Sequence, residues 1–548
     1  MLIVFLTATA AFLLAYRIYG GYLNRKFDVT DKNETPSHKD YDGVDRVPTK
    51  KAVLLGHHFS SIAGAGPIVG PIIAGIAFGW LPALLWIILG SIFVGGVHDY
   101  SSLMASIRHK ARSVAEIAKI YMSPLSYKLF LIFIWLALVY ILIVFIDLTT
   151  AGFVSSPEVA TSSTFFILLA LAFGITINKL GFSLGKASFI FVPLVFAGVY
   201  LGHLLPFSQD IIPAFVGGDM AKTWNIILII YCLVASVSPV WVLLQPRDYL
   251  SSFLLYGSLL GAFIGILFGD FNLSYPYFTD WSSIDKGTLF PILFITIACG
   301  ACSGFHSIVS SGTTSKQLDK ESDARPIGYG AMLIEGLVAV IALFTVAMLT
   351  TESSLLTAHP LEVYGNGIGN FVAILGLPFE IGKSFGILAV STFLLTTLDT
   401  STRLGRYIFE EFFNIKGKNT RYFSTVATLV LPIAFTFMTL YDIKGNPIPV
   451  WQAIWPVFGA TNQLLAGLAL LVVFVWLRKK GKNSIFVVIP MLFMLIMTLW
   501  ALFQLILESG FTMVGIIAIV LLILAVILII EAFRTIMAKN VKYSFHPK

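Results

Sequence analysis

The sequence predicts an all-helical integral membrane protein with about 15 transmembrane helices. Of its 548 residues, 57% are hydrophobic and only 12% are charged, and the mean hydropathy is +0.87. Apolar runs of the roughly 20 residues that a helix needs to cross a bilayer recur along the whole chain. The charges lie mainly between these runs. We therefore predict one polytopic membrane domain over residues 1–548 and no soluble module.

Fifteen runs are apolar enough to span a membrane. They lie near residues 1–20, 58–78, 80–98, 128–148, 163–178, 186–205, 224–244, 250–270, 289–309, 328–350, 379–398, 422–440, 452–476, 484–507 and 512–533. We expect residues 1–22 to form a peripheral first helix and residues 422–535 to form additional C-terminal helices. The run Ile368–Leu377 is too short to cross and predicts a half-helix or a loop insertion.

The positive charges predict the orientation in the membrane. Cytoplasmic loops carry an excess of Lys and Arg. If the N-terminus is outside, the 36 Lys and Arg fall in cytoplasmic segments with the exceptions of Lys222, Lys286, Lys383 and Lys444. No basic residue precedes the first apolar run, so we predict a retained helix and not a cleaved signal peptide. The predicted orientation is N-terminus out and C-terminus in.

Charge and cysteine content restrict the partners. A net charge of +7 and a pI of 9.0 are compatible with nucleic acid or with an anionic surface. Because the basic residues lie in loops between apolar runs, we expect a lipid bilayer and no nucleic acid. Cys232, Cys299 and Cys302 lie inside apolar runs, which argues against a disulfide framework. The CxxC spacing of Cys299 and Cys302 permits a redox pair, but we favour close helix packing through small residues.

The second apolar run contains the most informative segment, Gly56–Pro71. Glycine and proline are so frequent between Gly64 and Pro71 that we expect a broken helix. Free backbone groups at a break can line a cavity and bind an ion or an anionic substrate; the alternative is close packing through small residues. Polar residues at the entrance favour a site. We predict a structural role for Pro67 and substrate-binding roles for His57, His58, Ser60, Ser61, Gly64 and Gly66.

Six motifs, in order along the chain, resemble those of the carbon starvation protein A (CstA) family. They are His57–Pro71, Gly96–Tyr100 (GVHDY), Gln245–Leu250 (QPRDYL), Cys302–Ser307 (CSGFHS), Thr397–Arg403 (TLDTSTR) and Trp455–Gln463 (WPVFGATNQ). The resemblance implies a transporter of the bacterial cytoplasmic (inner) membrane, induced on nutrient limitation, that takes up peptides or, in some members, pyruvate with protons. The family is also distantly similar to LeuT/APC-like transporters, which implies a five-plus-five inverted repeat with broken helices, here as a transport core within residues 52–400.

An inverted repeat requires a second broken helix that enters the membrane from the opposite face. Counting five helices onward from the second run leads to residues 224–244. There Ser236–Trp241 interrupts the run, and Gln245–Asp248 closes it. We therefore expect Ser238, Trp241 and Gln245 to line the wall opposite the first break.

Ionisable groups inside the membrane are costly, so each is a functional hypothesis. We predict that Glu335 and His306 carry a coupling proton; alternatively, Glu335 is a buried carboxylate hydrogen-bonded to a neighbouring helix. Ser307, Ser310 and Ser311 in the ninth helix suit sodium, or they bond to their own backbone. The coupling ion is thus H+ or Na+, and no cofactor is expected.

A further group of polar residues lies at the predicted ends of helices. His98, Asp99 and Arg247 are candidates for gating or for anchoring helices. Asp399 and Arg403 are four residues apart, so the simplest interpretation is an ion pair within one helix, with gating as the alternative.

Absent motifs restrict the function. There is no GxxxxGK[ST] loop, which argues against an ATP-driven pump, and neither GxSxG nor HExxH occurs. Adjacent histidines on a helix point about 100° apart, so we expect no metal site built from His57 and His58. We predict a secondary transporter that works by alternating access and is not an enzyme. An intramembrane enzyme and a nutrient sensor are the rival classes. The choice between peptide and pyruvate, and the oligomeric state, are left open.

Overall fold

The computed structural model describes residues 1–43, 46–207, 213–239, 242–283, 287–415, 417, 419–441 and 446–537. These residues are helical apart from loops and two hairpins, in which β1 (Ser282–Ser283) pairs with β2 (Gly287–Thr288) and β3 (Leu440–Tyr441) pairs with β4 (Pro447–Ile448). Within them, twelve helices are long and apolar enough to cross a membrane, and one bent pair brings the number to thirteen. The prediction of an all-helical, multi-pass membrane protein is confirmed.

The candidate spans follow the apolar runs of the sequence. They are α1 (Leu2–Lys26), the bent pair α3 (Lys51–Ile62) and α4 (Gly66–Phe78), the continuous α5 (Trp80–Gly90), η1 (Ser91–Gly95) and α6 (Gly96–Arg108), α8 (Pro124–Ser155), α9 (Pro157–Asn178), α10 (Leu184–Leu204), α11 (Met220–Val237), α12 (Leu244–Phe268), the joined η3 (Glu321–Asp323), η4 (Arg325–Gly330) and α17 (Ala331–Ala347), α19 (Phe379–Phe413), α21 (Val450–Lys479), α22 (Ile485–Ser509) and α23 (Met513–Met537).

Two of the fifteen predicted helices are not among these spans. The run near residues 289–309 is divided into short helices, namely α13 (Leu289–Thr296), α14 (Ala298–Ala301), α15 (Phe305–Val309), η2 (Ser310–Thr314) and α16 (Ser315–Gln317). The run near residues 422–440 forms α20 (Thr420–Thr436), which has only 17 residues. Length and composition therefore support 12 or 13 spans, because one run is broken and the other is short.

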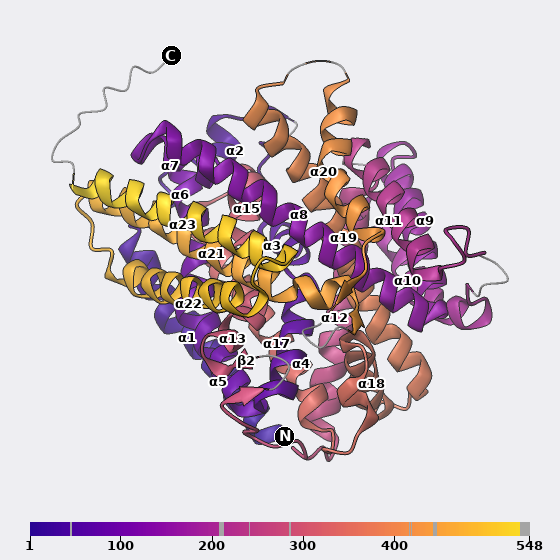
Figure 1. The fold of residues 1–548 in the computed structure, drawn as a ribbon. Coiled ribbons are helices and arrows are strands. Elements are labelled where there is room, and N and C mark those ends of the chain that lie inside the picture. Colours follow the sequence, from indigo (N-terminus) through magenta and orange to yellow (C-terminus); the bar gives the residue numbers. More distant parts are fainter. Residues whose placement is uncertain are drawn as a thin grey trace.

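Burial separates inner helices from a rim. The most apolar window of α21 is 94% buried and that of α19 is 83% buried, whereas the corresponding value is 22% for α1 and 28% for both α10 and α23. The rim helices expose large apolar side chains such as Leu13, Phe189 and Phe533. A bilayer covers such surfaces without the cost of exposing them to water. In Figure 1 α22 and α23 lie on the left and the α9–α10 hairpin lies on the right, with α8 and α19 between them.

Three further short helices lie between the spans. They are α2 (Pro36–Lys39), α7 (Val114–Tyr121) and α18 (Pro360–Ala373), and α18 is preceded by η5 (Ser354–Thr357). The capping box of Ser113 and Glu116 begins α7, which packs on α8 and α21. Helix α18 packs on α12 and α19 and contains most of the run predicted as a short insertion. Figure 1 shows α7 at the top and α18 at the bottom.

The connection from α1 to α3 forms hydrogen bonds with the segment that follows α16. Glu321 is 1% exposed and lies at the centre of this contact. Its carboxylate is 2.8 Å from Nε of Arg108 and accepts hydrogen bonds from the side chain of Asn33 at 3.0 Å and the backbone N–H of Thr30 at 3.2 Å. These donors replace the water that the buried carboxylate has lost.

Candidate substrate and ion site

The predicted break in the second span is present and narrower than expected. Helix α3 ends at Ile62, α4 begins at Gly66, and the two axes differ by 47°. The N–H of Gly64 donates to the carbonyl of Ile62 at 2.8 Å, a tight turn outside the helical pattern. Pro67 lies in the first turn of α4, where its missing N–H costs no hydrogen bond.

The glycine-rich segment contains both a break and a region of close helix packing. A Cβ on Gly66 would lie 2.2 Å from Cβ of Cys299, and one on Gly70 would lie 2.5 Å from the carbonyl oxygen of Thr296. These glycines thus allow α4 to pack closely against the α13–α14 segment. Gly64, by contrast, lies at the break, where a Cβ would be 3.2 Å from Oγ1 of Thr397.

A second break occurs in the divided run Leu289–Gln317. Helix α14 ends at Ala301 and α15 begins at Phe305. Oδ1 of Asn462, on α21, accepts the N–H of Phe305 at 3.0 Å, and the carbonyl of Asn462 accepts the N–H of Gly304 at 3.1 Å. The free ends of this break are therefore held by α21.

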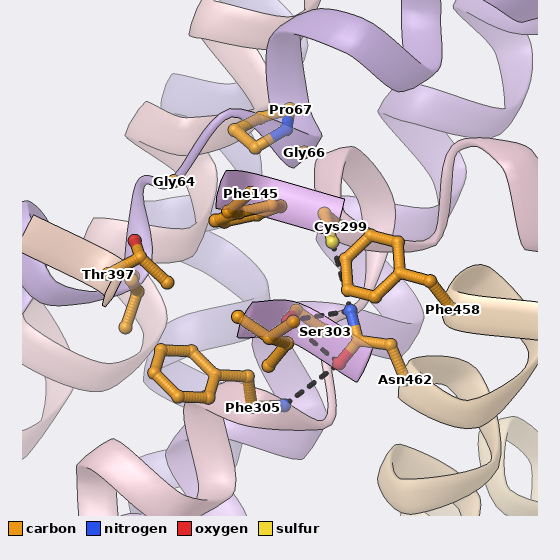
Figure 2. Close-up of a pocket in the computed structure, with 12 residues that line it drawn as sticks. Gly64, Gly66, Pro67, Phe145, Cys299, Ser303, Phe305, Thr397, Phe458 and Asn462 are labelled. Atoms are coloured by element: carbon orange, nitrogen blue, oxygen red, sulfur yellow. Dashed lines mark hydrogen bonds between the residues drawn. The ribbon is translucent and has the colours of Figure 1, made fainter. Parts of the chain in front are cut away.

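The two breaks face one small cavity. Its empty volume is about 280 Å³ including the open space at its mouth. The lining residues come from both broken segments and from α8, α19 and α21; they are Ile62, Gly64, Gly66, Pro67, Ile141, Phe145, Cys299, Ser303, Phe305, Thr397, Phe458 and Asn462. Figure 2 shows the Asn462 side chain bonded to Cys299, Ser303 and the backbone of Phe305. Thr397 is on the other side, and its hydroxyl has no hydrogen-bond partner among the described residues.

The predicted substrate-binding residues divide between this cavity and other places. Gly64 and Gly66 line it. Ser61 donates to the carbonyl of His57 in its own helix at 2.8 Å, and Ser60 donates to the carbonyl of Asp248 at 3.4 Å. His57 and Ser60 thus face α12, on which Asp248 lies.

The predicted break near Ser236–Trp241 is wrong. Helix α11 is continuous to Val237, and α12 begins at Leu244, so the polar segment ends one helix and precedes another. Ser238 donates to the carbonyl of Val234 at 2.7 Å, and Gln245 is exposed in the first turn of α12. Neither residue is among those lining the cavity. Trp241 lies outside the described residues. The second break is instead at residues 302–304, in the predicted ninth helix.

A buried chain of carboxyl and imidazole groups lies beside the first break. Nδ1 of His306 is 2.7 Å from Oδ2 of Asp99, and Nε2 of His306 is 3.3 Å from Oε2 of Glu335. Nδ1 of His98 is 2.8 Å from the other oxygen of Asp99. These four side chains are at most 1% exposed. The carbonyl of Ile62 also contacts His306, so the chain of groups touches the end of α3.

The hydrogen positions limit the charge states of this cluster. An ionised Asp99 only accepts, so Nδ1 of His306 carries a hydrogen. If Nε2 carried none, its lone pair would face Glu335, and an ionised Glu335 would repel it. The contact is therefore favourable with one proton, held either as imidazolium beside carboxylate or as imidazole beside carboxylic acid. Oε1 of Glu335 has no hydrogen-bond partner among the described residues. This arrangement can bind and release one proton.

Most hydroxyl groups of the ninth predicted helix bond to their own backbone. Ser307 donates to the carbonyl of Gly304 at 2.7 Å, and Ser311 donates to the carbonyl of Ser307 at 2.7 Å. Ser310 is buried and has no partner among the described residues. Such local bonds use the hydroxyl hydrogens of Ser307 and Ser311 within the helix.

A second buried cluster surrounds Arg247. This side chain is 0% exposed and contacts Asp399 on α19, and its Nη2 is 3.2 Å from Oδ1 of Asp248. The hydroxyl of Tyr231 donates to Asp399 at 3.0 Å. Nδ1 of His57 is 3.8 Å from Oδ2 of Asp248.

The predicted ion pair between Asp399 and Arg403 is wrong. Asp399 pairs with Arg247. Arg403 donates to the carbonyls of Ala235 and Ser238 at 2.7 and 2.8 Å, at the end of α11. Helical spacing permitted the i, i+4 pair, but a buried arginine on another helix offers the carboxylate a partner screened from water, which is the stronger interaction.

Comparison with known proteins identifies the family. The sequence profile described as carbon starvation protein CstA matches residues 1–366 and 349–501. The chain belongs to the CstA family. It is 33% identical to the peptide transporter CstA of Campylobacter jejuni, over 90% of this chain and 78% of that protein. It is 32% identical to the pyruvate/proton symporter BtsT of Escherichia coli, over 90% and 80%, and 31% identical to the peptide transporter CstA of Bacillus subtilis, over 95% and 94%.

This CstA-family chain is therefore a membrane transporter and not an enzyme. Among solved structures, a manganese transporter of Eremococcus coleocola matches 91% of this chain and 99% of its own, with 13% identity and a TM-score of 0.45. In the part of this CstA-family chain that the structure describes, no three His, Cys, Asp or Glu residues are grouped so as to hold a metal ion.

Several residues at the cavity were not assigned a role from the sequence. They are Cys299, Thr397, Asn462 and the aromatic pair Phe145 and Phe458. Thr397 and Asn462 lie in motifs shared with the CstA family, which was the available signal. The aromatic residues lie in apolar runs and have no distinguishing local pattern.

Proposed function

We propose that this CstA-family chain is a proton-coupled secondary transporter that imports small carboxylate-bearing nutrients, short peptides or pyruvate, across a bacterial cytoplasmic membrane. One observation carries the proposal: two broken helices meet at a cavity beside a buried Asp99–His306–Glu335 cluster that can hold one proton. The names of relatives, a peptide transporter and a pyruvate/proton symporter, support the same substrate classes.

The proposed architecture is a five-plus-five inverted repeat. The paired elements are α3–α4 with α13–α16, α5–α6 with η3–α17, α7 with α18, α8 with α19, α11 with α20, and α12 with α21. Packing supports this pairing. Two of the paired elements contact each other directly, because α8 packs on α19 and α11 packs on α20. A third relation is matched in the two halves, because α7 packs on α21 and its counterpart α18 packs on α12, the counterpart of α21. The second span of each half contains a π-helical turn, η1 or η4.

In this arrangement α9–α10 is an insertion, and an even number of spans (α5–α6, α8, α9, α10, α11 and α12) lies between the two broken segments, as inversion requires. The transport core would cover residues 51–479, beyond the limit of residue 400 expected from sequence. Helix α1 would be peripheral, and α22 and α23 would be the additional C-terminal helices. Fifteen crossings with the N-terminus outside and the C-terminus inside would agree with the distribution of Lys and Arg.

We assign substrate binding to the cavity between the breaks. Gly64 and Gly66 offer backbone groups without a side chain in front, while Thr397, Ser303 and Asn462 offer polar side chains. The cavity itself has a volume of about 20 Å³, room for about one water molecule, so this conformation is closed around the site and substrate binding requires it to open further.

We assign the coupling ion as a proton. Glu335 and His306 share a contact that is favourable with one proton, whereas Ser307 and Ser311 donate to their own helix. His306 contacts the carbonyl of Ile62 at the break. A change in the protonation of His306 would therefore change the electrostatic interaction with the backbone that lines the cavity.

Uptake by the purified protein in liposomes tests the proposal. With an inward proton gradient we expect labelled pyruvate or dialanine to accumulate, and Glu335→Gln should strongly reduce accumulation while exchange of substrate across the membrane continues. Glu362→Gln is the matched control, since that side chain is partly exposed on α18. Accumulation of neither substrate under a proton or a sodium gradient would refute coupled transport of these compounds, and unchanged proton-driven uptake in Glu335→Gln would exclude Glu335 as the proton carrier.

A further inference from the structure

Helix α3 lies between two buried acidic clusters and presents one histidine to each. Nδ1 of His58 is 2.8 Å from the hydroxyl of Thr314, and this imidazole is close enough to interact electrostatically with Asp99. His57 faces the other cluster, with its Nδ1 3.8 Å from Oδ2 of Asp248. Successive side chains on a helix point about 100° apart, so adjacent histidines can serve two different neighbours.

The charges of the second cluster do not balance. One guanidinium, Arg247, contacts two carboxyl groups, those of Asp248 and Asp399. All three side chains are at most 2% exposed. If both carboxyls are ionised, a net negative charge is buried, which is strongly unfavourable. A bound proton removes that charge. Among the described residues, no three His, Cys, Asp or Glu are grouped so that a metal ion could be held instead.

The two carboxyl groups are not equivalent. Oδ2 of Asp399 accepts hydrogen bonds from both the Arg247 guanidinium and the Tyr231 hydroxyl. Asp248 accepts a hydrogen bond from Arg247 at 3.2 Å on Oδ1 and is contacted by Thr396. Each carboxyl has one oxygen without a hydrogen-bond partner among the described residues, Oδ1 of Asp399 and Oδ2 of Asp248, and His57 lies 3.8 Å from the latter. Charge-assisted donors favour the ionised form, so Asp399 is the better stabilised anion.

The groups that face these carboxyls come from four helices. They are His57 on α3, Tyr231 and Cys232 on α11, and Arg247 on α12. The two carboxyls also face each other, Asp248 from α12 and Asp399 from α19. His57 differs from the others because its side chain is 22% exposed. It is therefore the group of this cluster that reaches the protein surface.

We propose that Asp248 is a second proton-binding site, separate from the Asp99–His306–Glu335 cluster, and that it exchanges its proton through His57. The proposal rests on the proposed function, because it makes two protons move with each substrate. In each exchange His57 takes a proton from water on one ring nitrogen and gives up the proton on Nδ1 to Oδ2 of Asp248. The imidazole ends neutral and the carboxyl ends as an acid; the 3.8 Å separation is one that a water molecule can bridge.

The number of protons is measured with wild-type protein in liposomes clamped at zero voltage, using pyruvate and dialanine as probes. The direction of net flux reverses where the proton and substrate gradients balance. Because each tenfold ratio carries the same free energy, a tenfold substrate gradient is balanced by about one pH unit for one proton and about half a pH unit for two. Reversal at half a unit is expected. Reversal at one unit would overturn the second site without any variant being made.

Variants then locate the second proton. Asp248→Asn should move the reversal point from half a pH unit to one, while the control Glu362→Gln should leave it unchanged. His57→Gln should keep the wild-type reversal point and slow the approach to it, because it removes the exchanging group and not the binding site. A reversal point in Asp248→Asn that equals that of the wild type would contradict the proposal.

An infrared measurement separates this proposal from the proposed function. Difference spectra of the full-length protein between acidic and alkaline pH report protonated carboxylic acids by their carbonyl stretch, with no substrate present. We expect separate losses of signal in Asp248→Asn and in Glu335→Gln. If transport fails but the Asp248 signal is present, the proposed function is wrong and the proton site stands; if Asp248→Asn leaves the spectrum unchanged, the site is refuted whatever the transport result.

Discussion

The contact between Gly66 and Cys299 provides a sharp test of how the broken helix is held. A Cβ on Gly66 would lie 2.2 Å from Cβ and 2.4 Å from Sγ of Cys299, both inside the 3.0 Å that real Cβ atoms essentially never show. The next atom, Cα of Cys299, would be at 3.7 Å, an ordinary contact. Gly66→Ala should therefore clash, and Cys299→Gly should remove the clash completely.

The magnitudes follow from packing. Overfilling a closely packed site costs about 1–3 kcal/mol, and the short distances place Gly66→Ala at the upper end. Cys299→Gly loses a small buried side chain and adds a flexible residue to a helix, for a cost of about 1–2 kcal/mol. The double variant should cost about as much as Cys299→Gly alone. The expected coupling therefore equals the whole cost of Gly66→Ala, about 3 kcal/mol in favour of the double variant.

Thermal inactivation in detergent measures this coupling. Because large membrane proteins unfold irreversibly, the half-life at a fixed temperature and the apparent midpoint are compared across the four proteins. Gly21→Ala on α1 is the control, since nothing lies within 4 Å of its new Cβ. A Gly66→Ala protein as stable as the wild type, or one that Cys299→Gly does not rescue, would show that α4 and α14 are not held by this contact.

Three further outcomes are expected. Asn462→Ala removes the acceptor for the N–H of Phe305 and two contacts at the cavity, and it should weaken apparent substrate affinity about tenfold, by about 1–2 kcal/mol, in saturation uptake. Glu321→Ala leaves Arg108 without its buried partner; we expect a loss of about 1–3 kcal/mol and faster tryptic cleavage between α1 and α3. Burial holds the pKa of His109 below its ordinary value of 6.5, so the unfolded chain binds the proton first and stability falls as the pH drops through 6.5 towards the lower folded-state pKa. The thermal midpoint of His109→Gln should therefore fall less than that of the wild type over this range.

The sequence predicted the class of fold because membrane helices follow from composition and length. It also predicted a break in the second span, since glycine and proline restrict the backbone wherever they occur. It did not predict the second break. Residues 289–309 form an apolar run, and their division at residues 302–304 depends on Asn462, which binds the free N–H of Phe305 from a helix 157 residues away. A tertiary contact of this kind leaves no local pattern.

The site could be predicted in part for the same reason. His306 and Glu335 were notable because charged groups inside a membrane are rare. Their partner Asp99 was expected at a helix end, yet it is completely buried between two imidazoles. Spacing alone paired Asp399 with Arg403, whereas the fold pairs it with Arg247. Local periodicity predicts which residues share a helix face but not which helix packs on that face.

The location of the break, together with the two clusters, determines which part of the second span can move. Helix α4 packs closely at Gly66 against the side chain of Cys299 and at Gly70 against the backbone of Thr296, where not even a Cβ would fit. Helix α3 has only 12 residues, ends at a non-helical turn, and carries His57 and His58 towards opposite clusters. A proton gained on either side changes the electrostatic force on the same short helix, whereas α4 holds its place. We therefore infer that α3 is the element that responds to protonation, and that the turn at residues 63–65 allows it to tilt while the cavity wall formed by α4 stays in position.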